Sequence, residues 1–274
     1  FFYLLSLSYS TFRQKSRAGF SLAFLIWGSK SVGKPYIILR KIVSYACLET
    51  CASPGYFPDT LLKGRREKMR EEEKIFAGKM FDPRKQELKD IKHTAHEACR
   101  RFNQTDEYDP ARQELLRSIL GKCGEAFYCQ GPVQFNYGSH TFIGENFFAN
   151  FNFTVMDDAC VHIGNNVAIG PNVSLMATNH PLIASERMGV DEHGRTTMAE
   201  FASGIHIGDN VWIAANTVVI DGVHIGDNAV IGAGSVVTKD IPAGYLAYGN
   251  PCRPARPITE NDSKRHLILE EDIV

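Results

Sequence analysis

The chain has 274 residues, of which 44% are hydrophobic and 22% are charged, and its formal net charge is -1. This composition is that of a globular protein with a core, and it excludes a mostly disordered or collagen-like chain. No apolar run approaches the roughly 20 residues of a membrane span, and the near-neutral charge argues against nucleic-acid binding. The 7 cysteines show no zinc-like spacing, so we expect free thiols in a reducing, cytoplasmic compartment.

Residues 1–68 differ from the rest of the chain in charge. They carry 11 Lys and Arg against 3 Asp and Glu, and the first methionine of the chain is Met69. Their apolar stretches follow neither a helical period nor the alternation of a strand. We therefore predict that 1–68 is an extension outside the native domain. A basic, Ser-rich targeting segment is the alternative.

One motif in this extension imitates a phosphate-binding loop. Gly28, Gly33 and Lys34 have the spacing of that loop, but the next residue is Pro35 where a Ser or Thr is needed. Proline offers no hydroxyl to magnesium, and it disfavours the helix that should begin there. We predict that this segment binds no nucleotide.

Residues 69–124 are predicted to form a helical segment, here called the neck. Apolar residues at steps of three and four mark one helix face, namely Leu88, Ile91, Ala95, Ala98 and Phe102. Asp109 and Pro110 predict the start of a second helix, with Asp as the N-cap and Pro at the first helical position.

From about residue 125 to 257 the apolar period becomes six. The longest run consists of Ile207, Ile213, Val219, Ile225, Ile231 and Val237. A period of six is typical of a parallel β-helix, in which three hexads form one triangular coil of about 18 residues. The predicted fold class is therefore mainly β, a parallel β-helix of hexapeptide repeats with an N-terminal helical segment, followed by a tail at 258–274.

The hexads fail between Leu175 and Ile207. We expect a loop at 176–206 there, and an irregular segment of this size in a repeat domain is usually functional. Its most distinctive string is Thr-Asn-His-Pro, which contains His180. A plain surface histidine is the alternative interpretation of that residue.

Several strings beyond the hexads carry a family resemblance. They are AGKMFD at 77–82, NFFANFN at 146–152, DD at 157–158, TNHP at 178–181, NVWI at 210–213 and IGAGSVVTKDIP at 231–242. On these strings the stretch from about 71 to 257 resembles the maltose and galactoside O-acetyltransferases, hexapeptide-repeat sugar acetyltransferases that include nodulation-type members. The resemblance implies a left-handed winding of the β-helix and transfer of an acetyl group from acetyl-CoA to a sugar hydroxyl.

The resemblance also implies three catalytic roles. His180 would be the general base that takes the proton of the sugar hydroxyl, a role that neutral imidazole performs well near neutral pH. The backbone N–H of Ala215 would stabilise the oxyanion, and Glu200 would orient His180.

Two sets of binding residues follow from the same resemblance. The sugar would bind Asp82, Asn136, Asn150 and Asp158. Acetyl-CoA, the co-substrate, would lie along Trp212, Ala233, Thr238, Lys239, Arg253 and Arg256. Carboxylates and amides suit hydroxyls, and cations suit phosphates. For Asp158 a role as a simple turn residue stays open.

The implied assembly is a homotrimer with sites between subunits, with a small-molecule sugar acceptor and no metal, membrane or nucleic-acid partner. The identity of the sugar stays open among maltose, glucose, a galactoside and a chitooligosaccharide. Two other function classes also stay open. One is a zinc carbonic anhydrase on the same fold, for which His206 and His224 lie one coil apart. The other is a non-catalytic binding protein.

Overall fold

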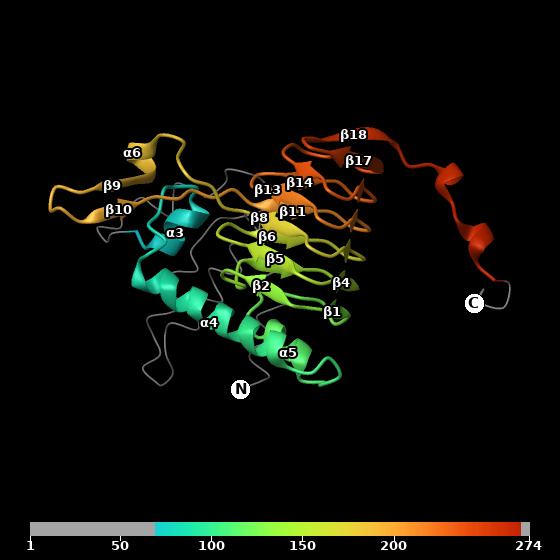
Figure 1. Cartoon of the computed structure of the whole chain (residues 1–274), viewed down its shortest axis with the longest axis horizontal. Coiled ribbons are helices and arrows are strands. Elements are labelled where there is room, and N and C mark those ends of the chain that lie inside the picture. The colour runs from blue at the N-terminus through green and yellow to red at the C-terminus, as the bar shows by residue number, and fades with distance from the viewer. Residues whose placement is uncertain (1–68, 270–274) are drawn as a thin grey trace, which may run out of the picture. The chain divides into compact units, whose positions relative to one another are not determined.

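The computed structural model describes residues 69–269, which form a helical neck and a stack of parallel β-coils (Figure 1). The neck contains α3 (Glu71–Phe76), α4 (Gln86–Gln104) and α5 (Arg112–Arg117). The predicted extension and its phosphate-loop-like motif lie outside the described residues.

Each coil has three sides, and each side is a sheet of strands from successive coils. The first side contains β1 (Phe127–Cys129), β4 (Phe147–Ala149), β7 (Ala168–Ile169), β12 (Trp212–Ile213), β15 (Val230–Ile231) and β17 (Tyr245–Gly249), with β18 (Cys252–Pro257) antiparallel at its edge. The second side contains β2 (Val133–Phe135), β5 (Phe153–Met156), β8 (Ser174–Met176), β13 (Val218–Ile220) and β16 (Val236–Val237). The third side contains β3 (Thr141–Ile143), β6 (Val161–Ile163), β11 (Ile205–Ile207) and β14 (His224–Ile225).

The predicted inward-facing column of the hexads is confirmed. Ile213, Val219, Ile231 and Val237 have no exposed surface, and Ile207 and Ile225 are almost as buried. Each of these residues stacks on its equivalent in the next coil, as Ile207 does on Ile225. Burial of one such side chain stabilises the fold by roughly 1.5–3 kcal/mol, so the repeated column supplies the core of the β-helix.

Asparagine turns two of the three corners. At the corner between the third and first sides, the residues are Asn146, Asn166, Asn210 and Asn228. At the corner between the first and second sides they are Asn152, Asn172 and Asn216. All seven have a positive φ of 55–60°, which asparagine tolerates better than most residues. Their side-chain amides donate from one coil to the next, which ties each column into a ladder.

The corner between the second and third sides, here called the second corner, is different. In the N-terminal coils, paired residues such as Phe135 and Val155 are 20 positions apart, whereas Val219 and Val237 are 18 apart. The expected coil of about 18 residues therefore holds only for the C-terminal coils. The additional residues lie at the second corner. The step from the inward-facing Phe135 to the inward-facing Ile143 is eight positions, whereas a regular hexad has a step of six.

The same corner carries the largest insertion, residues 177–204, here called the excursion. It contains α6 (Ala184–Arg187) and a hairpin of β9 (Met188–Val190) and β10 (Thr196–Met198) that extends away from the coils (Figure 1). Because the strands on either side keep their register, Leu175 and Val219 still pair directly across this insertion.

The helices of the neck pack against the first coils. The predicted apolar face of α4 is buried, and Asn103 at its end both donates to and accepts from the backbone of Val133. Helix α5 begins at Arg112, two residues later than the sequence predicted. Asp109 still accepts the backbone N–H of Ala111, so it caps the preceding turn instead of the helix.

The chain after β18 forms two short 3-10 turns, η3 (Glu260–Asp262) and η4 (Arg265–Leu267). Within residues 69–269, none of the helices combines the length and the apolar character needed to cross a membrane.

Candidate active site

His180 lies at the start of the excursion, where the chain leaves the second corner. Asn179 holds it there through three contacts. The Asn179 side-chain oxygen accepts the His180 backbone N–H at 2.8 Å, its amide donates to Asp221 at 3.1 Å, and its backbone bridges to Phe201. The two ends of the excursion are thereby closed onto each other, which fixes the direction of the imidazole.

Glu200 returns from the other end of the excursion to meet this imidazole. Its Oε1 atom lies 3.7 Å from His180 Nε2, and His180 Nδ1 lies 3.4 Å from the carbonyl oxygen of Ala199. Glu200 is 9% exposed and its backbone pairs with Phe81 of the neck. Burial and the nearby Asp158 raise the pKa of the Glu200 carboxyl, while His180 opposes the shift.

Asp158 lies at the same corner, one coil closer to the neck. It is 2% exposed, and its Oδ2 atom accepts the side-chain amide of Asn136 at 3.3 Å. Its other oxygen, Oδ1, is buried with no hydrogen-bond partner among the described residues. A buried acceptor without a hydrogen-bond partner is unusual in a folded protein. A ligand that donates a hydrogen bond to Oδ1 would explain it.

Asn136 and Asp82 complete this group. The Asn136 side-chain oxygen accepts the ring N–H of His96 at 3.3 Å. The guanidinium of Arg84 binds both oxygens of Asp82 and holds the pKa of that carboxyl below its ordinary value. Because Arg84 also donates to Thr196 of β10, this residue joins the neck to the tip of the excursion.

Lys92 belongs to the same group, although the sequence analysis did not select it. Its ammonium donates to the carbonyl oxygen of Pro83 at 2.9 Å and lies 5.7 Å from the centre of the Tyr137 ring. Burial raises the pKa of both Asp158 and Glu200, and the positive charge of Lys92 reduces that rise. The available signal was its position, four residues after Leu88 on the face of α4 that is otherwise apolar.

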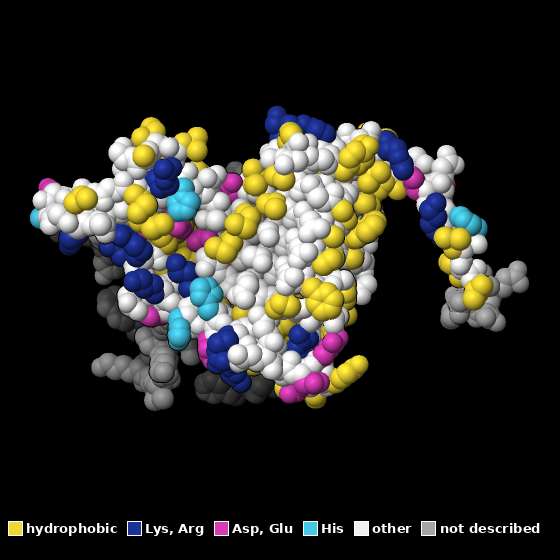
Figure 2. All heavy atoms as spheres, in the orientation of Figure 1, with side chains coloured by type: hydrophobic (Ala, Val, Ile, Leu, Met, Phe, Trp, Pro, Cys, Tyr) yellow, Lys and Arg dark blue, Asp and Glu magenta, His cyan; other side chains and the backbone are white. Residues whose placement is uncertain are grey.

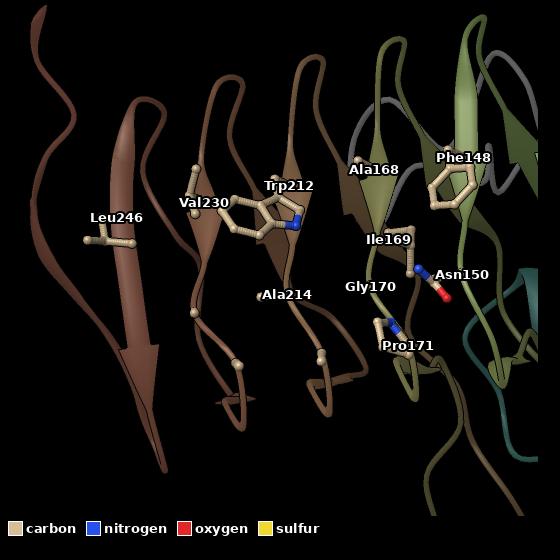
Figure 3. Close-up of a pocket in the computed structure, with 13 residues that line it drawn as sticks. Phe148, Asn150, Ala168, Ile169, Gly170, Pro171, Trp212, Ala214, Val230 and Leu246 are labelled. Carbon is tan, nitrogen blue, oxygen red and sulfur yellow. The ribbon is translucent and has the colours of Figure 1, made fainter. Parts of the chain in front are cut away.

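A second group of predicted residues lies on the first side and at its corner with the second side. There an open groove of about 640 Å³ is lined by Phe148, Asn150, Ala168, Ile169, Gly170, Pro171, Trp212, Ala214, Ala215, Val230, Gly232, Ala233 and Leu246. Trp212 is 53% exposed and stands on β12 between Ala168 and Val230 (Figure 3). Asn150 lies beside Pro171 at the edge of the same groove (Figure 3).

Ala215 lines this groove, and its backbone N–H donates to no acceptor among the described residues. A Cβ atom on Gly170 would lie 2.7 Å from the Ala215 nitrogen. The glycine therefore keeps the N–H uncovered, and a carbonyl oxygen in the groove could accept from it.

The remaining predicted residues lie toward the C-terminal coils. Thr238 and the exposed Lys239 follow β16 at the second corner, and the exposed Arg253 and Arg256 lie on β18 at the edge of the first side. Arg256 is engaged by Asp262, which it contacts at 2.6 and 2.8 Å.

The predicted site residues thus fall into two groups on opposite edges of the second side. His180, Glu200, Asp158, Asn136 and Asp82 form the first group, and Asn150, Trp212, Ala215 and Ala233 form the second. Within the described residues, no hydrogen bond or ion pair joins the groups.

The two histidines considered for a zinc site, His206 and His224, lie in a stack of rings that also contains His162. His162, His206 and His224 stack face to face on the third side, with ring centroids 4.7–4.9 Å apart. Such parallel rings cannot converge on a tetrahedral ion. Across residues 69–269, no group of three or more His, Cys, Asp or Glu is placed to hold a metal.

The coils and their six-residue period define a hexapeptide-repeat protein. Residues 74–124 match the maltose acetyltransferase hexapeptide capping motif, and residues 204–239 match the bacterial transferase hexapeptide repeat. The galactoside O-acetyltransferase of Escherichia coli is 41% identical over 200 residues, which cover 73% of this chain and 94% of that protein. Nodulation protein L of Rhizobium meliloti is 35% identical over 67% of this chain and 96% of its own length.

Two solved structures give the same result. A galactoside acetyltransferase in complex with coenzyme A superposes with a TM-score of 0.65 at 41% identity, covering 71% of this chain and 94% of that one. A maltose O-acetyltransferase from Clostridium difficile gives 0.60 at 37% identity, covering 71% and 100%. The chain belongs to the galactoside and maltose O-acetyltransferase family.

Proposed function

We propose that the protein transfers the acetyl group of acetyl-CoA to a hydroxyl group of a sugar, with His180 as the general base. The observation that carries the proposal is the grouping at the second corner. There an imidazole beside Glu200 lies at the same corner as a buried carboxylate, Asp158, that has a free oxygen. The sugar acetyltransferases among the relatives support the same reaction.

The surroundings of the imidazole support its proposed role as the base. The contact between His180 Nε2 and Glu200 orients the ring and stabilises the positive charge that develops when the ring takes a proton. Asp158 can accept a second hydroxyl of the same sugar, and Asn136 can donate to it or accept from it. A sugar ring held at two hydroxyls would present a third to His180.

The groove of the second group fits the co-substrate. Acetyl-CoA, when bound, supplies an acetyl group activated as a thioester. The Ala215 N–H would donate to the acetyl carbonyl oxygen as negative charge develops there. Trp212 and Ala233 offer an apolar lining, while Lys239, Arg253 and Arg256 would neutralise phosphates.

The separation of the two groups supports a site shared between copies, as in the proposed homotrimer. The first side exposes a row of apolar side chains, one per coil: Phe148, Ala168, Trp212, Val230 and Leu246. Hydrophobic side chains run down this side of the coils (Figure 2). A neighbouring copy that covers this row would bring its own His180 to the Ala215 N–H of the first.

A thioester-cleavage assay tests the proposal. The protein is incubated with acetyl-CoA and either maltose, glucose, a galactoside or a chitooligosaccharide, and free thiol is measured with the acetylated sugar. We expect acceptor-dependent thiol release that yields an ester. Binding of a sugar without any thiol release would instead support the non-catalytic alternative.

A further inference from the structure

His140 is a buried residue of the second corner that the proposed chemistry does not use. It is 2% exposed. Its ring stacks on that of Tyr137, with centroids 4.6 Å apart and planes at 10°, and meets the edge of Phe76 from α3 at 4.9 Å. An ionisable ring at this depth needs partners for both nitrogens.

The hydrogen bonds of His140 define where its protons are. Its Nδ1 atom lies 2.9 Å from the carbonyl oxygens of both Asp157 and Asp158, and because a carbonyl only accepts, Nδ1 carries a proton. Its Nε2 atom lies 3.5 Å from Oε1 of Glu72, a side chain that is only 12% exposed. Nε2 is buried and makes no hydrogen bond among the described residues, so its approach to Glu72 is an ion-pair contact that is favourable when Nε2 carries a proton as well. The ring is then an imidazolium.

The charges around the ring agree with this assignment. Burial lowers the pKa of His140, but the contact with Glu72 and the charge of Asp157 outweigh it, and the net pKa lies above the ordinary value. Asp157 is fully buried and accepts the Tyr137 backbone N–H and the Thr141 hydroxyl. The ring therefore lies between the carboxylate of Glu72 on α3 and the backbone carbonyl groups of Asp157 and Asp158 at the second corner.

Asp158 is the group that this cation affects. Burial raises the pKa of Asp158, and the largest opposing influence is His140, followed by Lys92. Two other charged groups lie nearby: burial and Asp158 raise the pKa of Glu200, and the guanidinium of Arg70 lies 3.6 Å from the Glu72 carboxylate. Asp158 is thus held at its backbone carbonyl by His140 and at Oδ2 by Asn136. Thr178 and Tyr137 also interact with the carboxyl, but Oδ1 has no hydrogen bond of good geometry among the described residues and can accept one from a ligand.

We propose that Glu72 and His140 form a positioning pair that fixes the Asp157–Asp158 peptide and thereby aims the Asp158 carboxylate at the acceptor. The inference rests on the proposed function, because it assigns the pair to acceptor binding. It makes acceptor affinity depend on α3, which lies outside the coils and supplies Glu72.

Kinetics of two variants test the pair. H140N keeps a donor for the carbonyl oxygens but removes the charge, and E72Q removes the charge of the partner while keeping its size. We expect KM for the acceptor to rise about tenfold at pH 7, because a hydrogen bond to a less firmly held carboxylate loses a free energy of that order. KM for acetyl-CoA should stay within about twofold.

The pH dependence separates this role from a merely structural one. Without the cation the pKa of Asp158 rises, so the acceptor KM of H140N should return toward that of the wild type as the pH is raised to 9. Damage to packing would not recover in this way. H193N, a change at an exposed histidine of the excursion, is the matched control and should behave as the wild type at every pH. A wild-type acceptor KM and pH profile in both H140N and E72Q would overturn the proposal.

A measurement without substrate distinguishes failure of the pair from failure of the proposed function. Nitrogen NMR of the free protein should show both ring nitrogens of His140 protonated at pH 7. A neutral His140 ring at pH 7 would overturn the pair even if the protein acetylates sugars. If the wild type acetylates no sugar, the proposed function fails, and the assignment of His140 to acceptor binding fails with it, whatever the ring signals show.

Discussion

The Nε2 atom of His180 lies 3.7 Å from Oε1 of Glu200, although the helix and the hairpin of the excursion lie between the two residues in the chain. Two backbone bridges produce this contact. One joins Asn179 to Phe201, and the other joins Glu200 to Phe81 of the neck. The orientation of the imidazole therefore depends on three segments that are distant in sequence.

Replacement of Glu200 by Gln should lower kcat about tenfold. The amide can still occupy the position next to His180, but it stabilises the protonated ring less than a carboxylate does. KM for acetyl-CoA should be unchanged, since that residue lies away from the groove. Steady-state kinetics with both substrates varied measure the two effects, and an unchanged kcat would show that Glu200 plays no part in orienting the base.

Replacement of His180 by Ala should lower kcat by roughly 10²–10⁴, the usual contribution of a general base. Acetyl-CoA affinity, measured by calorimetry, should change little because the groove remains intact. H193A is the control, since His193 is an exposed histidine of the same excursion. Wild-type kcat in the His180 variant would mean that another group takes the proton.

A subunit-mixing experiment tests the shared site. His180→Ala inactivates the group at the second corner, and Asn150→Ala impairs the group at the groove. Suppose that each site joins one group from each of two copies. Equal amounts of the two variants assembled together should then regain about a quarter of wild-type activity. In about a quarter of the interfaces, one copy supplies an intact His180 and its neighbour supplies an intact Asn150. Mixed assemblies no more active than the separate variants would indicate a site within one chain.

Loss of the cations should affect the co-substrate. Lys239→Ala and Arg253→Ala should raise KM for acetyl-CoA several-fold more than they lower kcat, because phosphate binding precedes chemistry. The effect should shrink at high salt, where exposed charges are screened. Dephospho-acetyl-CoA serves as the control substrate, and it should be less sensitive to both changes. Equal losses with the two substrates at all salt concentrations would speak against phosphate contacts.

The ring ladder of the third side predicts a pH dependence of stability. Phe142 stacks on His162, and His206 and His224 continue the ladder. Burial lowers the pKa of His162 to about 4, below its unfolded value near 6.5. The free energy of unfolding is therefore unaffected by this titration above pH 6.5. It decreases as the pH falls toward 4, because the unfolded chain binds the proton more readily than the folded protein. His162→Phe should keep the stacking and remove this loss, on the order of 2 kcal/mol at pH 4.

Urea unfolding of both proteins at pH 7 and pH 4 measures this difference. Asp157 acts in the opposite direction, since burial raises its pKa to about 6 and the folded protein then binds a proton more readily than the unfolded chain. Because both proteins contain Asp157, its effect cancels in the comparison. Parallel losses of stability in the two proteins would show that His162 does not contribute.

The sequence by itself determined the β-helix and the face of α4. Both follow from a local period, since residues such as Ile213 and Val219 are buried wherever the hexad continues, and Leu88 and Phe102 wherever the helix does. The interruption of that period also located the excursion that carries His180.

Only the tertiary structure decided how the site residues are grouped. Asp158 and Asn150 are only eight positions apart, but they lie at different corners of the coil and therefore in different groups. The two additional residues in each N-terminal coil determine which corner each residue occupies. Lys92 reaches the second corner from α4, and His140 meets Glu72 of α3, which is 68 positions away in the chain. Such placements come from contacts between distant parts of the chain, which a repeat pattern does not encode.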